Sequence, residues 1–247
     1  PLYVLLPNYY ARNFGVSLAT LGALLLAVRL FDTVIDPWLG RTTDRLFHRT
    51  PAAVLQVAAL LALVLCIGFG LLFFPPESWS STTDTPDARL LAWLSASLLM
   101  TTVAYSALSI LHQAWGARLG GNEAMRSRVV AWREGLGLAG VILASVAPLA
   151  LGFPGTVALL FIASGLAWLA WRAAPVPSSA SVSAAHGHPP STLGMGYPWS
   201  RPGFRSLMAV FMVNGIASAV PATLILFFVQ DRLQALPAME PVFLGSY

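Results

Sequence analysis

The stretch SLATLGALLLAVRLFDTVIDPWL, residues 17–39, decides the fold class. It is mostly apolar, and as a helix rising about 1.5 Å per residue it is long enough to cross about 30 Å of hydrocarbon. Comparable runs predict membrane helices at about 1–12, 17–39, 51–74, 89–113, 128–151, 155–172 and 206–230. The composition agrees, because 57% of the residues are hydrophobic and 10% are charged, against about 25% charged in a soluble domain. The sequence therefore predicts an all-α membrane protein.

The distribution of arginine predicts how the helices are oriented. All fourteen basic residues are arginines. Most lie in the connections after the second, fourth and sixth spans, at Arg41, Arg45, Arg49, Arg118, Arg126, Arg128, Arg172, Arg201 and Arg205. Short arginine-rich connections stay on the cytoplasmic side. We therefore expect a multi-pass protein of the cell (inner) membrane whose residues 40–50, 114–127 and 173–205 face the cytoplasm, and whose arginines signal topology rather than nucleic-acid binding.

A Pro-, Ser-, Ala- and Gly-rich segment divides the chain. Residues 173–205 read as a flexible cytoplasmic linker between a six-helix bundle, residues 1–172, and the start of a second bundle, residues 206–247. This layout resembles major-facilitator carriers, which rock two six-helix halves around a central site. We expect the first half, with an incomplete first helix, plus helix seven and the onset of helix eight, truncated at both ends. His186 and His188 in the linker are expected to be solvated, and Cys66 alone builds neither a disulfide nor a metal site.

Charged residues inside hydrocarbon are costly and mark candidate functional positions. Arg29, Asp32 and Asp36 recur at i, i+3 and i+7, which places them on one helical face. Two carboxylates one turn apart repel each other unless a proton, a metal cation or an arginine offsets them. The pattern therefore predicts a cation site. The alternative is a neutralised network in which Arg29 bridges Asp32 and Asp36 caps the following loop.

A second polar stripe is expected on the fourth span, where Tyr105, Ser109 and His112 repeat at i, i+4 and i+7 beside Ser106. This stripe can face the same cavity. The alternative is that its hydroxyl groups bond to their own helix.

The fifth span carries Arg133 and Glu134. The planar guanidinium of Arg133 suits a hydroxylated solute, and because consecutive residues point about 100° apart, we expect Arg133 and Glu134 not to pair. Gly135, Gly137 and Gly140 match a dinucleotide-binding spacing, but without a preceding strand we interpret them as allowing close helix packing. On the seventh span, Asn214 is a further candidate ligand.

Three segments resemble the glycoside-pentoside-hexuronide cation symporter (melibiose permease-like) family of the major facilitator superfamily. RLFDTVIDPWLGRTTDR, residues 29–45, is similar to the second-helix signature, which leads into a cytoplasmic loop at Gly40, Asp44 and Arg45. YSALSILHQAWGARL, residues 105–119, resembles the fourth helix, and NGIASAVPATLILFFV, residues 214–229, fits the seventh more loosely.

The resemblance implies roles for individual residues. Asp32, Asp36 and Ser106 match the cation site, and Arg133 matches the arginine that contacts sugar. Ile35 stands where sodium-coupled members have an asparagine ligand, and Ser109 stands where they have a sugar-binding aspartate. A missing neutral oxygen weakens a sodium site more than a proton site, which favours proton coupling.

We therefore expect a monomeric secondary transporter, not an enzyme, that couples a cation, H⁺ or Na⁺, to the symport of a sugar or glycoside and needs no cofactor or metal. The first alternative is an uncoupled carrier of lipids or other amphiphiles within the same superfamily. An intramembrane aspartyl hydrolase is disfavoured because Asp32 and Asp36 share one helix instead of facing each other across a water. A receptor or scaffold would call for a ligand-binding loop domain, and the sequence contains none.

Overall fold

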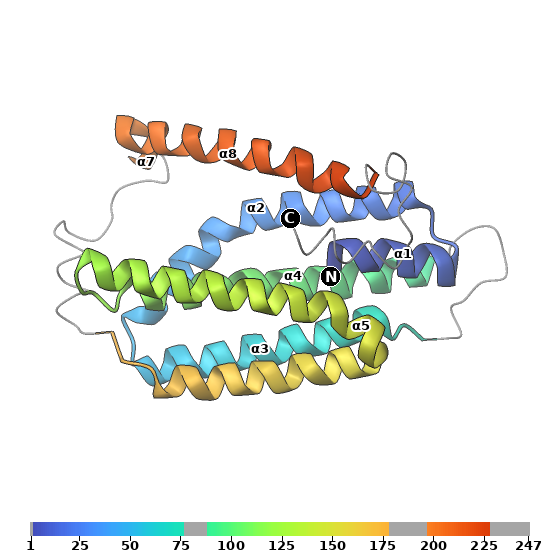
Figure 1. Cartoon of the computed structure of the whole chain (residues 1–247), viewed down its shortest axis with the longest axis horizontal. Helices are drawn as coiled ribbons and strands as arrows, with labels where there is room; N and C mark the ends of the chain where they lie inside the picture. The colour runs from blue at the N-terminus through green and yellow to red at the C-terminus, as the bar shows by residue number, and fades with distance from the viewer. Residues whose placement is uncertain (1, 77–87, 178–196, 228–247) are drawn as a thin grey trace. The chain divides into compact units, whose positions relative to one another are not determined.

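The computed structural model describes residues 2–76, 88–177 and 197–227, and these are helical with no strand among them. The chain divides into two compact units, Pro1–Val182 and Ser183–Tyr247, each of which is described by itself. The first unit contains α1 (Leu2–Phe14), α2 (Leu18–Phe47), α3 (Pro51–Phe73), α4 (Ala88–Ala117) and α5 (Glu123–Ala173), as Figure 1 shows. The second contains α7 (Tyr197–Ser200) and α8 (Pro202–Phe227).

Five helical stretches of the described chain are long and apolar enough to cross a membrane. They are Leu18–Phe47, Pro51–Phe73, Ala88–Arg118, Glu123–Pro148 and Ala150–Ala173. The predicted all-α membrane fold is therefore confirmed. α8 covers the predicted seventh span as far as Phe227, and the last three residues of that span, 228–230, lie outside the described residues.

The fifth and sixth predicted spans are the two halves of α5. The helix reverses at Gly152, whose φ of 68° and ψ of 178° belong to a backbone region that essentially only glycine adopts. Pro154 follows two residues later and begins the new helix with its fixed φ. Figure 1 shows the second half of α5 running back along the first. The break falls within the short gap that the sequence leaves between residues 151 and 155.

α2 is longer than the sequence suggested. Its first turn is capped by Ser17, whose Oγ accepts a hydrogen bond from the Thr20 amide at 3.1 Å. The helix then continues to Phe47, so the expectation that Gly40, Asp44 and Arg45 form a cytoplasmic loop is wrong. A single glycine costs a helix only about 1 kcal/mol, and no proline follows it before the helix ends.

The predicted linker, residues 173–205, is helical at its end. α7 and the first turn of α8 occupy residues 197–200 and 202–205, which corrects the expectation of a flexible segment there. Its central part, residues 178–196 with His186 and His188, lies outside the described residues. The domain boundaries therefore stay a prediction.

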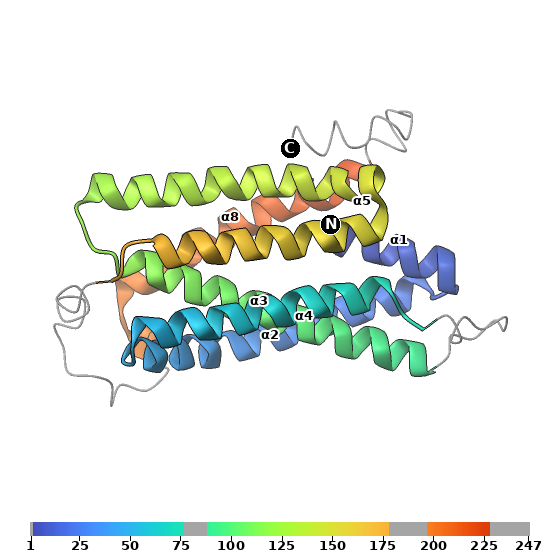
Figure 2. The same ribbon diagram turned by 90° about the horizontal axis from the view of Figure 1, so that it is seen from below.

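The bundle of the first unit is centred on α3 and α4, which pack along each other in both views of the ribbon (Figures 1 and 2). α2 packs mainly on α4 and α5 packs on α3. The second half of α5 supplies that contact, because the Sγ atom of Cys66 lies 3.4 Å from the Ser164 hydroxyl oxygen and Trp168 donates a hydrogen bond to the Leu55 carbonyl. The largest buried cluster joins α1 to α4 through Leu6, Tyr10, Val16, Leu21, Val28, Leu72, Phe73, Leu90, Leu94 and Leu98.

The C-terminal end of α3 is held by aromatic side chains of its neighbours. The last carbonyl groups of a helix have no partner within the helix. Here Tyr10 donates to the Leu72 carbonyl at 2.8 Å, and Tyr9 donates to the Phe73 carbonyl at 3.0 Å. The indole of Trp93 donates to a third carbonyl of this end, that of Leu71, at 2.9 Å. α1 and α4 are thereby attached to the same end of α3.

A close approach of α3 to α4 occurs at Gly68 and leads to a stability prediction. A methyl group on this glycine would lie 2.6 Å from Thr101 Oγ1 and 3.3 Å from the Thr101 amide nitrogen. We expect Gly68→Ala to destabilise the protein by about 1 to 3 kcal/mol through overpacking. The measurement is the thermal unfolding midpoint in detergent.

The matched control is Gly70→Ala on the same helix, because the nearest atom to its added methyl group is Val157 Cγ1 at an ordinary 3.7 Å. Both substitutions change helix propensity equally, so their difference isolates the contact. Adding Thr101→Ala to Gly68→Ala should restore part of the loss. An equal effect of the two glycine substitutions would contradict the prediction.

Candidate functional site

Two residues of the predicted cation site, Asp32 and Ser106, are in contact. Asp32 on α2 and Ser106 on α4 are both buried, with 8% and 9% of their surface exposed. The Ser106 hydroxyl donates a hydrogen bond to Asp32 Oδ1 at 2.7 Å, the distance of a strong bond to an ionised acceptor. Two residues that lie far apart in the sequence are thus brought together, as predicted.

Asp36 lies one turn further along the same face of α2. Its Oδ1 atom is buried and accepts no hydrogen bond from the residues that the structure describes. A buried acceptor without a donor is costly, and Asp32 adds a second carboxylate nearby. Arg29 on the same helix also lies within electrostatic range of Asp36, and a cation role for the two carboxylates stays a prediction. The alternative in which Asp36 caps a loop is wrong, because α2 continues for almost three turns beyond it.

The three residues of the polar stripe on α4, Tyr105, Ser109 and His112, lie in three different surroundings. Tyr105 is 62% exposed within the first unit. Ser109 accepts a hydrogen bond from Gln113 of the same helix at 3.0 Å, which is the local bonding that we considered as the alternative. The ring of His112 meets the ring of Trp171 edge to face, with centroids 5.0 Å apart. Ser106, beside this stripe, is the residue that faces Asp32.

Arg133 and Glu134 form an ion pair, so the expectation that they do not pair is wrong. The Nε and Nη2 atoms of Arg133 both donate to Glu134 Oε1, at 3.1 and 2.6 Å. The two backbone directions diverge, but both side chains are long and exposed enough to bend toward each other. The guanidinium also lies within electrostatic range of the His112 imidazole. The charge of Arg133 on α5 is therefore felt by His112 of the α4 stripe.

The pair on α5 lies inside the predicted span 128–151. Arg133 is five residues, about 7 Å along the axis, beyond the start of that span. Charged groups are costly when they face lipid tails. We therefore expect this face of α5 to meet water or protein.

The glycines of α5 do not make the close helix contacts that we expected. A methyl group built on Gly135, Gly137 or Gly140 would meet no atom within 4 Å in the described part of the chain. No residue of the most apolar window of Glu123–Pro148 is buried in the first unit. None of the three glycines is therefore packed against another helix of the described part of the chain.

Asn214 lies on α8 in the second unit, where its side chain is exposed. The two units are not placed relative to each other, so its role as a ligand stays a prediction. Within the described residues, no three His, Cys, Asp or Glu side chains gather closely enough to hold a metal ion.

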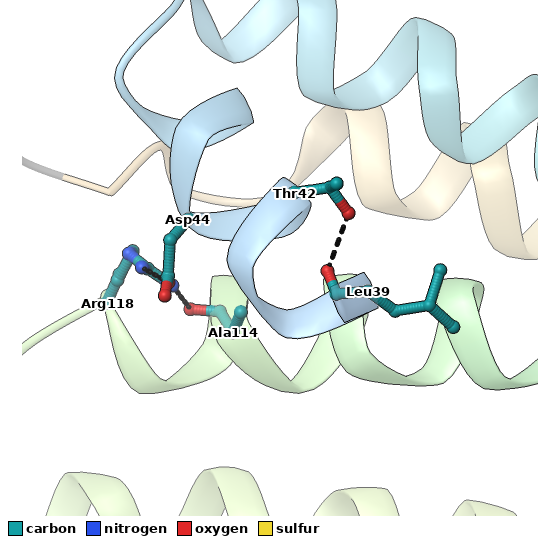
Figure 3. Close-up of polar contacts among 5 residues, drawn as sticks. All are labelled: Leu39, Thr42, Asp44, Ala114 and Arg118. Atoms are coloured by element: carbon teal, nitrogen blue, oxygen red, sulfur yellow. Dashed lines mark hydrogen bonds and ion pairs between the residues drawn. The ribbon is translucent and has the colours of Figure 1, made fainter. Parts of the chain in front are cut away.

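A contact that sequence reasoning missed joins the ends of α2 and α4. Arg118 Nη2 and Asp44 Oδ1 lie 2.7 Å apart (Figure 3), and the Arg118 Nη1 atom donates to the Ala114 carbonyl at 3.3 Å. The Arg118 guanidinium also lies 4.2 Å from the centre of the Phe47 ring. The sequence analysis interprets Arg118 only as a marker of the cytoplasmic side. The sequence does contain a signal for this contact, because Asp44 is the one acidic residue among the arginines of residues 40–50 and is predicted to lie at the same depth as Arg118.

This interhelical pair leads to a second prediction. Because the Asp44 side chain is 62% exposed, we expect a coupling free energy of only about 0.2 to 1 kcal/mol between Asp44 and Arg118. The measurement is a double-mutant cycle of unfolding in detergent with Asp44→Asn, Arg118→Gln and both together. Arg118→Gln alone should cost more than Asp44→Asn, because it also removes the contact with Phe47. Additive single effects would show that the pair does not interact.

Comparison with known proteins identifies the family. The chain matches the family described as MFS/sugar transport protein over residues 1–244, which is almost its whole length. No curated protein and no solved structure gave a match. A helical membrane bundle, a buried carboxylate site and an intramembrane ion pair all agree with a carrier. The chain therefore belongs to the MFS/sugar transport protein family of the major facilitator superfamily and is a membrane transporter.

Proposed function

We propose that the protein is a proton-coupled symporter of a sugar or glycoside, of the melibiose permease-like type. It acts as a monomer in the inner (cell) membrane. A proton bound by the Asp32 and Asp36 pair and a solute bound near Arg133 together permit the two halves of the carrier to reorient. Alternating access of this kind needs no covalent step and no cofactor.

The observation that carries the proposal is the unmatched Oδ1 atom of Asp36 beside Asp32. A proton on Asp36 would cancel the repulsion between the two carboxylates. Sodium would require several oxygen ligands around it. Ser106 already directs its hydroxyl proton at Asp32, and the apolar Ile35 offers no oxygen. These features favour a proton over sodium.

The solute is expected to contact Arg133, with Tyr105, Ser109 and His112 on the facing stripe and Asn214 from the second half. A guanidinium donates several hydrogen bonds in one plane, which suits the vicinal hydroxyl groups of a sugar. Glu134 holds this guanidinium in the absence of solute. A sugar would therefore compete with, or bridge, the Arg133 and Glu134 pair.

The test is transport by the full-length protein in proteoliposomes. Labelled hexoses, pentoses and glycosides are first screened by counterflow, which needs only the reorientation of a loaded carrier. Uptake of the best solute is then measured with an inward pH gradient at constant sodium, and with an inward sodium gradient at constant pH.

We expect accumulation with the pH gradient alone. Accumulation that follows sodium and ignores pH would overturn proton coupling. Counterflow of amphiphiles with no accumulation of sugar under either gradient would instead support the uncoupled lipid or amphiphile carrier.

A further inference from the structure

One face of α2 carries large apolar side chains that no described residue of the first unit covers. Leu30, Val34 and Trp38 recur every four residues, and 61%, 70% and 62% of their surfaces are exposed. The opposite face holds Leu21, Val28 and Asp32, which are buried in the bundle. The exposed face is therefore the one that α2 turns away from the first unit.

Two arginines continue this exposed face at the end of the helix. Arg41 and Arg45 follow Trp38 at i+3 and i+7, so they lie on the same side of α2. Both are exposed. They are one and two turns beyond the tryptophan, about 5 and 10 Å along the helix axis. The sequence of side chains along this face is thus apolar, aromatic and then cationic.

Asp44 is the one acidic residue in the last two turns of α2. Its carboxylate pairs with Arg118 of α4 (Figure 3) and so does not neutralise Arg41 and Arg45. Arg41 and Arg45 therefore present two positive charges on a face whose next residues are apolar. A bilayer presents a matching order, with hydrocarbon first, then the interface where tryptophan is enriched, and then the headgroups.

We propose that the end of α2 binds an anionic phospholipid, whose headgroup phosphate contacts Arg41 and Arg45 while its acyl chain lies against Trp38 and Val34. Guanidinium groups bind phosphate oxygens in a bidentate manner. Juxtamembrane basic residues contribute strongly to binding anionic lipids. The proposal does not depend on which solute or cation is carried.

The experiment is native mass spectrometry of the full-length protein in detergent, titrated with phosphatidylglycerol or phosphatidylcholine. We expect tighter binding of phosphatidylglycerol, and an increase of its dissociation constant of about five-fold for each arginine removed in Arg41→Gln, Arg45→Gln. The matched control is Arg126→Gln, Arg128→Gln. It removes the same charge from the expected same side, but these two residues point about 200° apart on α5. The conservative pair Arg41→Lys, Arg45→Lys should keep most of the preference.

A second measurement places the lipid and needs no change to the arginines. Brominated phosphatidylglycerol should quench tryptophan fluorescence of the parent more than brominated phosphatidylcholine does, and Trp38→Phe should remove most of that difference. High salt should weaken the preference, because it screens exposed charges. The proposal is overturned if the parent shows no preference for phosphatidylglycerol, if both glutamine pairs weaken binding equally, or if glycerol 3-phosphate in solution displaces the lipid as effectively as phosphatidylglycerol does.

Discussion

Asp36→Asn should abolish accumulation of solute against a gradient while downhill exchange continues. An asparagine at position 36 is uncharged and is not repelled by the Asp32 carboxylate, so the carrier can reorient without binding a proton. For one proton per solute, a gradient of one pH unit stores about 1.36 kcal/mol, which allows up to about ten-fold accumulation. The variant should lower this ratio to about one. The measurement is steady-state uptake in proteoliposomes with an imposed pH gradient.

The control for this variant is Glu123→Gln, which neutralises an exposed carboxylate in the first turn of α5, away from the pair. It should accumulate solute like the parent. Ser106→Ala removes the hydroxyl that donates to Asp32 and should weaken coupling less than Asp36→Asn. Accumulation at the parental level by the double variant Asp32→Asn, Asp36→Asn would refute the cation site.

Arg133→Lys is the second substitution with a large expected effect. A lysine keeps the positive charge and can still pair with Glu134, but it lacks the planar fork that binds two hydroxyl groups at once. A lost charged hydrogen bond typically costs about 1.5 to 3 kcal/mol, so solute affinity should fall by about ten-fold or more. Equilibrium binding of the solute identified by counterflow measures this loss.

Arg128→Lys is the matched control, since Arg128 is exposed on the same helix about one turn before Arg133. It should leave affinity unchanged. Both variants should insert and unfold like the parent. If Arg133→Lys binds solute as tightly as the parent does, the arginine serves the fold or the Glu134 pair and has to be removed from the site.

The sequence predicted the parts of this structure that depend on hydrophobic length. The spans of α2 to α5 and the break near Gly152 follow from apolar runs and from a glycine and proline between them. The resemblance to the cation symporter family also placed Ser106 with Asp32, and the two residues are in contact. Prediction from the sequence failed where the reach of a long side chain or the position of a helix end decides the structure. Arg133 reaches Glu134 by bending, and α2 continues through Gly40 because one glycine is a weak helix breaker.

The pair between Asp44 and Arg118 was unpredictable for another reason. Both residues lie near predicted span ends, where charges are usually assigned to water. Only the register of α2 against α4 places them 2.7 Å apart, and that register is set by side-chain packing between these two helices. Packing of this kind leaves no periodic signal in a single sequence.

The aromatic contacts at the end of α3 bear on how force passes through the carrier. Because Tyr9, Tyr10 and Trp93 hold consecutive carbonyl groups of one helix end, α1, α3 and α4 cannot tilt separately there without breaking hydrogen bonds in a dry environment. We therefore expect α1, α3 and α4 to move together at this end. A displacement of α4 where Ser106 meets α2 should then move all three helices and should not be absorbed by local bending of α4.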